Sequence, residues 1–194
     1  MLAQAASPAL DSTTVIVVVA VVAVLLILVA VLAAKRRSQA LRRRFGSEYD
    51  RTLADTGSRN RAEQELAARE TRVRKLQIQP LPSGARARYA EEWRSVQARF
   101  VDEPGPAVAA ASALVANVMR DRGYPTDDAE QNDADLSVQH AGVLNNFRVA
   151  REISLRNDRG EASTEDLRSA MVAYRSLFAD LLGTDPVSAS TAKE

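Results

Sequence analysis

The chain contains no cysteine and only one histidine among its 194 residues. Without cysteine it can form no disulfide, thiolate nucleophile or cysteine-ligated metal site. The histidine, His140, has no His-x-Glu or Glu-x-x-His spacing around it, so a zinc site would need several carboxylates to converge on it. We therefore expect no bound metal and no cofactor, and we expect His140 to play a structural part near the start of a helix.

The sequence also lacks the glycine-containing motifs that mark common catalytic sites. It has no Gly-x-Gly-x-x-Gly, no Walker loop and no Gly-x-Ser-x-Gly elbow. An acidic stretch at 127–135 lacks the central glycine of a calcium loop and is interpreted as a solvated loop that caps a short helix. A paired-carboxylate site stays open as an alternative, but the sequence favours a protein that is not an enzyme.

Residues 15–34 form the longest apolar run. They are twenty consecutive Val, Ile, Leu and Ala residues without charge, glycine or proline. At 1.5 Å per helical residue this run spans the ~30 Å hydrocarbon core of a bilayer. A single segment in lipid must satisfy its own backbone hydrogen bonds, so the run predicts a transmembrane helix despite its many β-branched residues.

The charges beside the run predict its orientation. Asp11 is the only ionisable side chain in the fourteen residues before it, whereas positions 35–44 hold six Lys or Arg. Basic flanks stay on the cytoplasmic side. We therefore expect a short extracytoplasmic N-terminus (1–14) and a cytoplasmic C-terminal domain at the cell membrane. The alternative is a signal peptide with a weak cleavage site at 31–33, which would make the protein an exported one.

The near-zero net charge conceals a strong asymmetry. Residues 35–77 carry thirteen basic and six acidic side chains, whereas residues 78–194 carry thirteen and eighteen. Basic residues beside a membrane are attracted to anionic headgroups. The alternative is that they only determine the orientation of the membrane span. Nucleic acid is not expected, because no stacking series of aromatics accompanies the charges. The predicted membrane-surface residues are Lys35, Arg36, Arg37, Arg42, Arg43 and Arg44.

Beyond the apolar run, apolar residues recur at helical spacings and no segment shows strand alternation. The sequence predicts an all-α protein with a basic juxtamembrane helical segment at 35–79, a helical bundle at 80–183 and a loose tail at 184–194. Gly46 and residues 56–58 are expected breaks. Expected N-caps are Ser83, a capping box of Asp127 with Glu130, and Ser163 or Thr164.

Most of the nine aromatic residues fall on the predicted bundle helices. Their spacing places them on one face of each helix, which is typical of a core. A ligand slot between the helices is the functional alternative. The predicted core residues are Tyr89, Trp93, Val96, Phe100, Phe147, Leu167, Met171, Tyr174, Phe178 and Leu181.

Six segments over about 42–182 resemble, in the same order, an uncharacterised bacterial family common in actinobacteria. They are RFGSEYDR at 44–51, RYAEEW at 88–93, ARFVD at 98–102, RGYP at 122–125, DLSV at 135–138 and GEASTEDLR at 160–168. The resemblance implies a small helical domain that follows one N-terminal hydrophobic span, in a membrane or secreted protein. It assigns no activity and no site residue to this chain. The chain has Ala141 and Ala173 where the family pattern tends to have proline and histidine, which argues against a working histidine pair.

The sequence thus favours a membrane-anchored helical interaction or scaffold module with an unknown protein partner. The alternatives are a small-ligand sensor or enzyme with a pocket in the helical domain, and an exported helical protein. Charged residues on one predicted juxtamembrane helix are candidates for docking a partner helix: Glu63, Glu65, Arg69, Glu70, Arg72 and Arg74.

Overall fold

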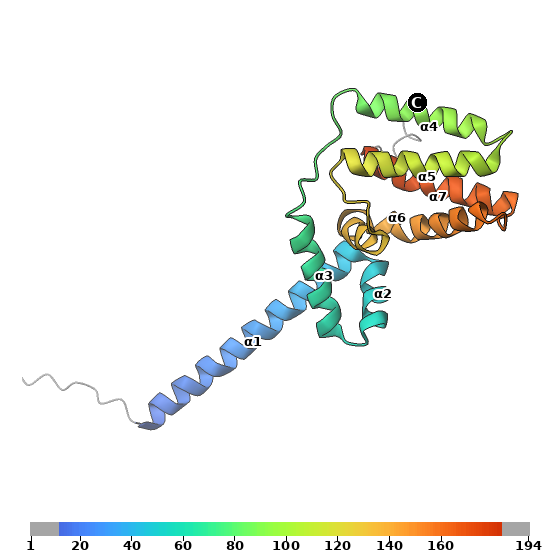
Figure 1. The fold of residues 1–194 in the computed structure, drawn as a ribbon. Helices are drawn as coiled ribbons and strands as arrows, with labels where there is room; N and C mark the ends of the chain where they lie inside the picture. Colours follow the sequence, from blue (N-terminus) through green and yellow to red (C-terminus); the bar gives the residue numbers. More distant parts are fainter. Residues whose placement is uncertain (1–11, 184–194) are drawn as a thin grey trace, which may run out of the picture.

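A computed structural model describes residues 12–183 as seven helices without a strand, which confirms the all-α prediction. Figure 1 shows one long helix leading into a packed helical body. The predicted tail and the first eleven residues of the predicted N-terminal segment lie outside the described residues. The helices are α1 (Ser12–Phe45), α2 (Ser47–Thr56), α3 (Arg59–Val73), α4 (Ala85–Arg99), α5 (Pro104–Asp121), α6 (Ala129–Asp158) and α7 (Thr164–Leu182).

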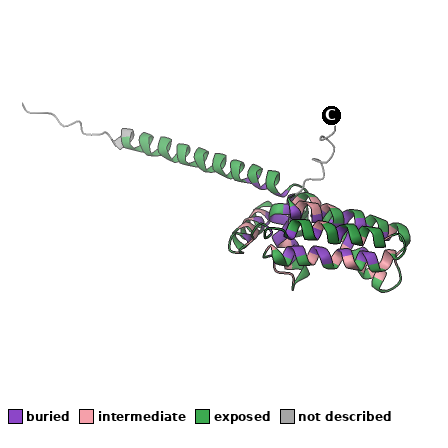
Figure 2. Ribbon diagram, turned by 90° about the horizontal axis from the view of Figure 1, so that it is seen from above, coloured by how far each residue is buried: buried purple, intermediate pink, exposed green. Residues whose placement is uncertain are grey.

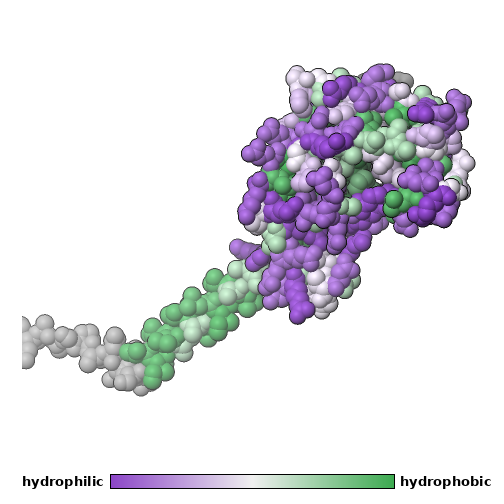
Figure 3. All heavy atoms as spheres, viewed as in Figure 1, coloured by the Kyte–Doolittle hydropathy of each residue, from purple (hydrophilic) through white to green (hydrophobic). Residues whose placement is uncertain are grey.

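The apolar part of α1 projects from the body. Every side chain from Val15 to Ala34 is exposed (Figure 2), and the hydrophobic surface of this stretch contrasts with the polar surface of the body (Figure 3). The helix is long and apolar enough to cross a membrane, and the most apolar part of it is not buried at all. A core helix of a soluble protein would bury that surface, so the two interpretations that fit are a membrane anchor and a signal sequence.

The end of α1 enters the body and packs with α2 and α3. The expected break at Gly46 is present with a φ of +50°, a positive value that glycine adopts readily, and the chain turns there from α1 into α2. The three helices share a small apolar cluster, completed by one residue of α6. Its buried members are Leu41, Phe45, Tyr49, Leu66, Val73 and Val138.

The larger core lies between α4, α5, α6 and α7. Trp93 stacks on Phe178 with ring centroids 4.8 Å apart, and Phe147 meets Tyr174 edge to face at 6.0 Å. Of the ten predicted core residues, Val96 and Phe100 lie partly buried against this cluster. The other eight are buried in it: Tyr89, Trp93, Phe147, Leu167, Met171, Tyr174, Phe178 and Leu181.

The start of α6 differs from the sequence interpretation. The segment expected to be a solvated loop is helical from Ala129 onward, and the N-cap is Asp128, whose carboxylate accepts from the N–H groups of Glu130 and Gln131. A helix forms here because Asp133 and Asp135 are buried and paired with arginines instead of repelling one another in solvent.

Two further cap predictions have opposite outcomes. Ser83 does not cap α4; the cap position is Gly84 in the left-handed region. Ser163 does cap α7, in a reciprocal capping box with Asp166. Helix α6 continues across a kink at His140, and it contacts α1, α2 and α3 as well as packing along α7.

Candidate functional site

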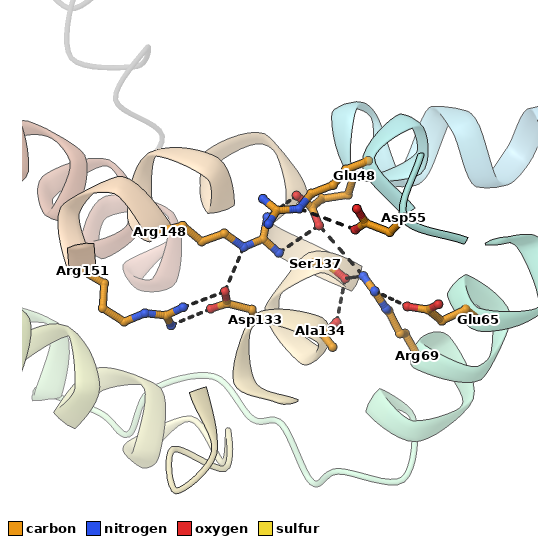
Figure 4. A network of polar contacts seen from close by, with 10 residues as sticks. Glu48, Asp55, Glu65, Arg69, Asp133, Ala134, Ser137, Arg148 and Arg151 are labelled. Carbon is orange, nitrogen blue, oxygen red and sulfur yellow. Dashed lines mark hydrogen bonds and ion pairs between the residues drawn. The ribbon is translucent and has the colours of Figure 1, made fainter. Parts of the chain in front are cut away.

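A charged cleft of about 670 Å³ lies between α2, α3 and α6. Nearly all of its lining side chains are charged or polar, and they come from three separate helices. Figure 4 shows the arginines and carboxylates that converge on its floor. We refer to this hollow as the charged cleft.

Arg148 of α6 holds the centre of the floor. Its Nη groups both donate to the Glu48 carboxylate of α2, with Nη2 to Oε2 at 3.0 Å, and its Nε donates to Asp133 Oδ2 at 2.8 Å. Arg151 extends this set of ion pairs, because both of its Nη groups donate hydrogen bonds to Asp133, at 2.8 and 2.9 Å. The planar guanidinium matches two carboxylates at once, so this network joins α2 to α6.

A second pair of arginines joins α3 to the same floor. Arg69 reaches Glu65, Glu48 at 3.9 Å and the Ser137 hydroxyl at 3.4 Å. Arg72 Nε donates to Asp135 Oδ1 at 3.0 Å. The Asp135 side chain is 0% exposed and that of Glu48 only 4%, so each of these carboxylates needs its cation inside the protein.

The network also fixes the charge state of its central cation. Burial alone would lower the pKa of the Arg148 guanidinium, but the hydrogen bonds and charges of Glu48 and Asp133 outweigh burial and raise its pKa above the ordinary value. Arg148 therefore stays cationic, and its Nε and both Nη groups are hydrogen-bonded within the network.

The rim of the charged cleft is more accessible than its floor. The Arg51 side chain is half exposed and lies 4.0 Å from Asp55, while Arg72 and Glu65 are also well exposed. Both signs of charge are therefore available at the opening. Within residues 12–183 we find no group of three or more His, Asp or Glu placed to hold a metal ion.

His140 lies at the kink of α6, where one helical stretch ends and the next begins, and it is 5% exposed. Its Nδ1 is 2.7 Å from Asp180 Oδ2 and its Nε2 is 3.1 Å from the Tyr124 hydroxyl. The Tyr124 hydroxyl has a single proton and also donates to Gln139 Oε1 at 3.1 Å, so the direction of its bond with Nε2 depends on the tautomer of the imidazole. Burial lowers the pKa of His140, although Asp180 opposes this, and burial raises the pKa of Tyr124 to about 12.

The predicted membrane-surface residues have two kinds of environment. Lys35, Arg36, Arg37 and Arg43 are exposed, and Arg42 lies over the Tyr49 ring at 4.8 Å. Arg44 instead pairs with Glu70 at 3.2 Å and donates to the Val138 carbonyl at 3.3 Å, which ties α1 to α3 and α6.

The sequence interpretation missed the floor of the charged cleft. Of the charged residues it named for partner docking, Glu65, Arg69 and Arg72 line the cleft, whereas Glu63 contacts Tyr49 and Arg59 outside it. The available signal was the presence of charges within apolar stripes, such as Glu48 beside Tyr49 and Arg148 beside Phe147. Comparison with protein-family models, curated proteins and solved structures finds no match to this chain.

Replacing Arg148 by methionine should destabilise the full-length protein in detergent micelles by about 3–5 kcal/mol, because Glu48 then stays buried without its main cation. The matched control is Arg94→Met, which removes one partner of an exposed ion pair with Glu91 and should cost below about 1 kcal/mol. Denaturant unfolding followed by fluorescence of the single tryptophan measures both. Equal, small losses would show that the network does not hold α2 to α6.

His140 should make the stability of the fold depend on pH. Its folded-state pKa lies below the unfolded value of 6.5, so the unfolded chain binds more protons between these values. This stabilisation is complete above about pH 6.5 and declines as the pH falls toward the folded pKa. The unfolding midpoint should fall more steeply between about pH 7.5 and pH 5 in the wild type than in His140→Gln. If the unfolding midpoints of the two proteins fell in parallel with pH, His140 would not be the source of the pH dependence.

Proposed function

We propose that this protein is a single-pass membrane protein whose helical body is an interaction module on the cytoplasmic face of the cell membrane. The observation that carries the proposal is the contrast between the two parts of the chain. The apolar stretch of α1 is wholly exposed, whereas the end of α1 and the other helices bury their apolar side chains in two clusters. Exposed apolar surface on this scale requires a lipid environment.

The orientation is inferred from the charges beside the span. Lys35, Arg36 and Arg37 follow the apolar stretch directly and are exposed, and basic flanks of this kind stay in the cytoplasm. The uncleaved anchor is favoured over an exported form because α1 continues without interruption from the apolar stretch to Leu41 and Phe45, which are buried in the body. The same helix would therefore both contact lipid and pack into the body.

The charged cleft is the surface that we assign to a partner. Its floor is rigid because the buried carboxylates are already paired, and its rim presents Arg51 and Arg72 together with Asp55 and Glu65. Such a surface is complementary to a polar segment that carries charges of both signs. It supports specificity for a protein partner through the geometry of its charges.

A ligand sensor or an enzyme with a pocket in the bundle core is less well supported. Trp93 and Phe178 are stacked against each other and buried, so they pack the core and do not line a slot. His140 and Tyr124 are enclosed as well, at 5% and 2% exposed, and their polar atoms bond to each other and to Asp180. A substrate would have no approach to this imidazole without movement of α6.

Site-specific crosslinking tests the interaction proposal. The chain has no native cysteine, so Ala68→Cys places a single thiol-linked photocrosslinker in the charged cleft and Ala109→Cys places one on the exposed side of α5. In native membranes we expect a discrete adduct from position 68 that is absent from position 109. Charge reversal at the rim, Arg51→Glu, should reduce that adduct because it removes electrostatic complementarity.

Two results would count against this proposal. The same adducts from both positions would show non-specific proximity in the membrane. No adduct from position 68, with the protein present in the membrane fraction, would show that the charged cleft has no partner there.

A further inference from the structure

The turn between α2 and α3 lies beside the membrane end of α1. Arg59, the first residue of α3, donates from its Nη2 to the Ser38 hydroxyl of α1, and Ser38 is buried by this contact. Ser38 is only four residues beyond Ala34, the last residue of the apolar stretch. At 1.5 Å per residue that separation is about 6 Å along the helix axis.

The turn is held firmly at this level. Gly57 ends α2 in the left-handed conformation, and its N–H donates to the Leu53 carbonyl at 3.0 Å. The Tyr49 hydroxyl of α2 donates to Glu63 Oε1 of α3 at 2.9 Å, and Arg59 Nε donates to the same oxygen at 2.9 Å. These bonds link α2, α3 and α1, so the turn cannot move away from α1 without breaking them.

Basic side chains from two distant parts of the sequence consequently lie at a similar position along the axis of α1. Lys35, Arg36 and Arg37 follow the apolar stretch, and Arg59 and Arg61 come from the first turn of α3. Arg61 is exposed and, among the residues that the structure describes, has no ion-pair partner. In Figure 1 this turn lies toward the projecting half of α1, whereas the turn between α4 and α5 lies at the far end of the bundle.

We propose that the turn between α2 and α3 is a second membrane contact, in which Arg59 and Arg61 meet the anionic headgroups that also meet Lys35, Arg36 and Arg37. This inference rests on the proposed membrane-spanning role of α1. Anionic headgroups are the complementary surface at this depth, because basic groups within a Debye length of ~8–10 Å are attracted to them. The contact would hold the body in one orientation instead of letting it pivot on one helix.

The orientation also bears on the charged cleft. Arg51, Thr52 and Asp55 of α2 line the cleft and directly precede the turn. A body fixed through the turn therefore presents one wall of the cleft close to the headgroup layer. The charged cleft would then bind molecules that are themselves located at the membrane.

Depth-dependent fluorescence quenching tests this contact with the full chain. Asn60→Cys places a fluorophore on the turn, and Val101→Cys places the same fluorophore on the exposed turn between α4 and α5. Both proteins are reconstituted into phosphatidylcholine vesicles with or without phosphatidylglycerol. A nitroxide-headgroup lipid in both leaflets serves as the quencher, so the direction of insertion does not matter.

We expect quenching of the label at position 60 to be several-fold stronger than at position 101, and stronger with phosphatidylglycerol than without it. Arg61→Gln should remove much of the phosphatidylglycerol effect, because it deletes a charge that has no ion-pair partner within residues 12–183. High salt should weaken the effect in the same way. Equal quenching at the two positions, in protein that floats with the vesicles, would overturn the second contact and leave the anchor intact. Protein that does not float with the vesicles would overturn the anchor and this inference together.

Discussion

The arrangement of the body depends on two carboxylates that are buried in its interior and paired with an arginine. Glu48 of α2 and Asp133 of α6 are both largely removed from water, and Arg148 lies between them with hydrogen bonds to each. An unpaired buried carboxylate is strongly destabilising, so the two helices are held together by the arginine that both require. The first half of α6 is helical for the same reason, since its acidic residues are paired instead of solvated.

This constraint connects the first three helices to the bundle. Helix α6 contacts α3 through Asp135 before its kink and α2 through Arg148 after it, and it packs on α7 along the apolar core. Helix α1 then joins the same unit through Leu41, Phe45 and the Arg44 pair with Glu70. In the proposed membrane orientation, the position that α1 takes at the headgroups would also set the position of the charged cleft, because α1 packs against the helices that line it.

The helices and the apolar core were predictable from the sequence because both follow from spacing along the chain. The stripe from Leu167 to Leu181 and the capping box at Ser163 are local patterns with local causes. The charged cleft was not predictable, because its ion pairs join residues far apart in sequence; Arg72 and Asp135 are separated by 63 positions. An acidic run by itself is typical of a solvated loop, and only the fold reveals which arginines neutralise it.

The central claim is that α1 is a retained anchor with the body in the cytoplasm. Labelling of Val101→Cys with a membrane-impermeant maleimide in intact and permeabilised cells tests it most directly, because this side chain is 83% exposed and the chain has no other thiol. We predict that the protein in the membrane fraction keeps its full length and is labelled only after permeabilisation. Labelling in intact cells, or a shortened chain outside the membrane fraction, would contradict the account.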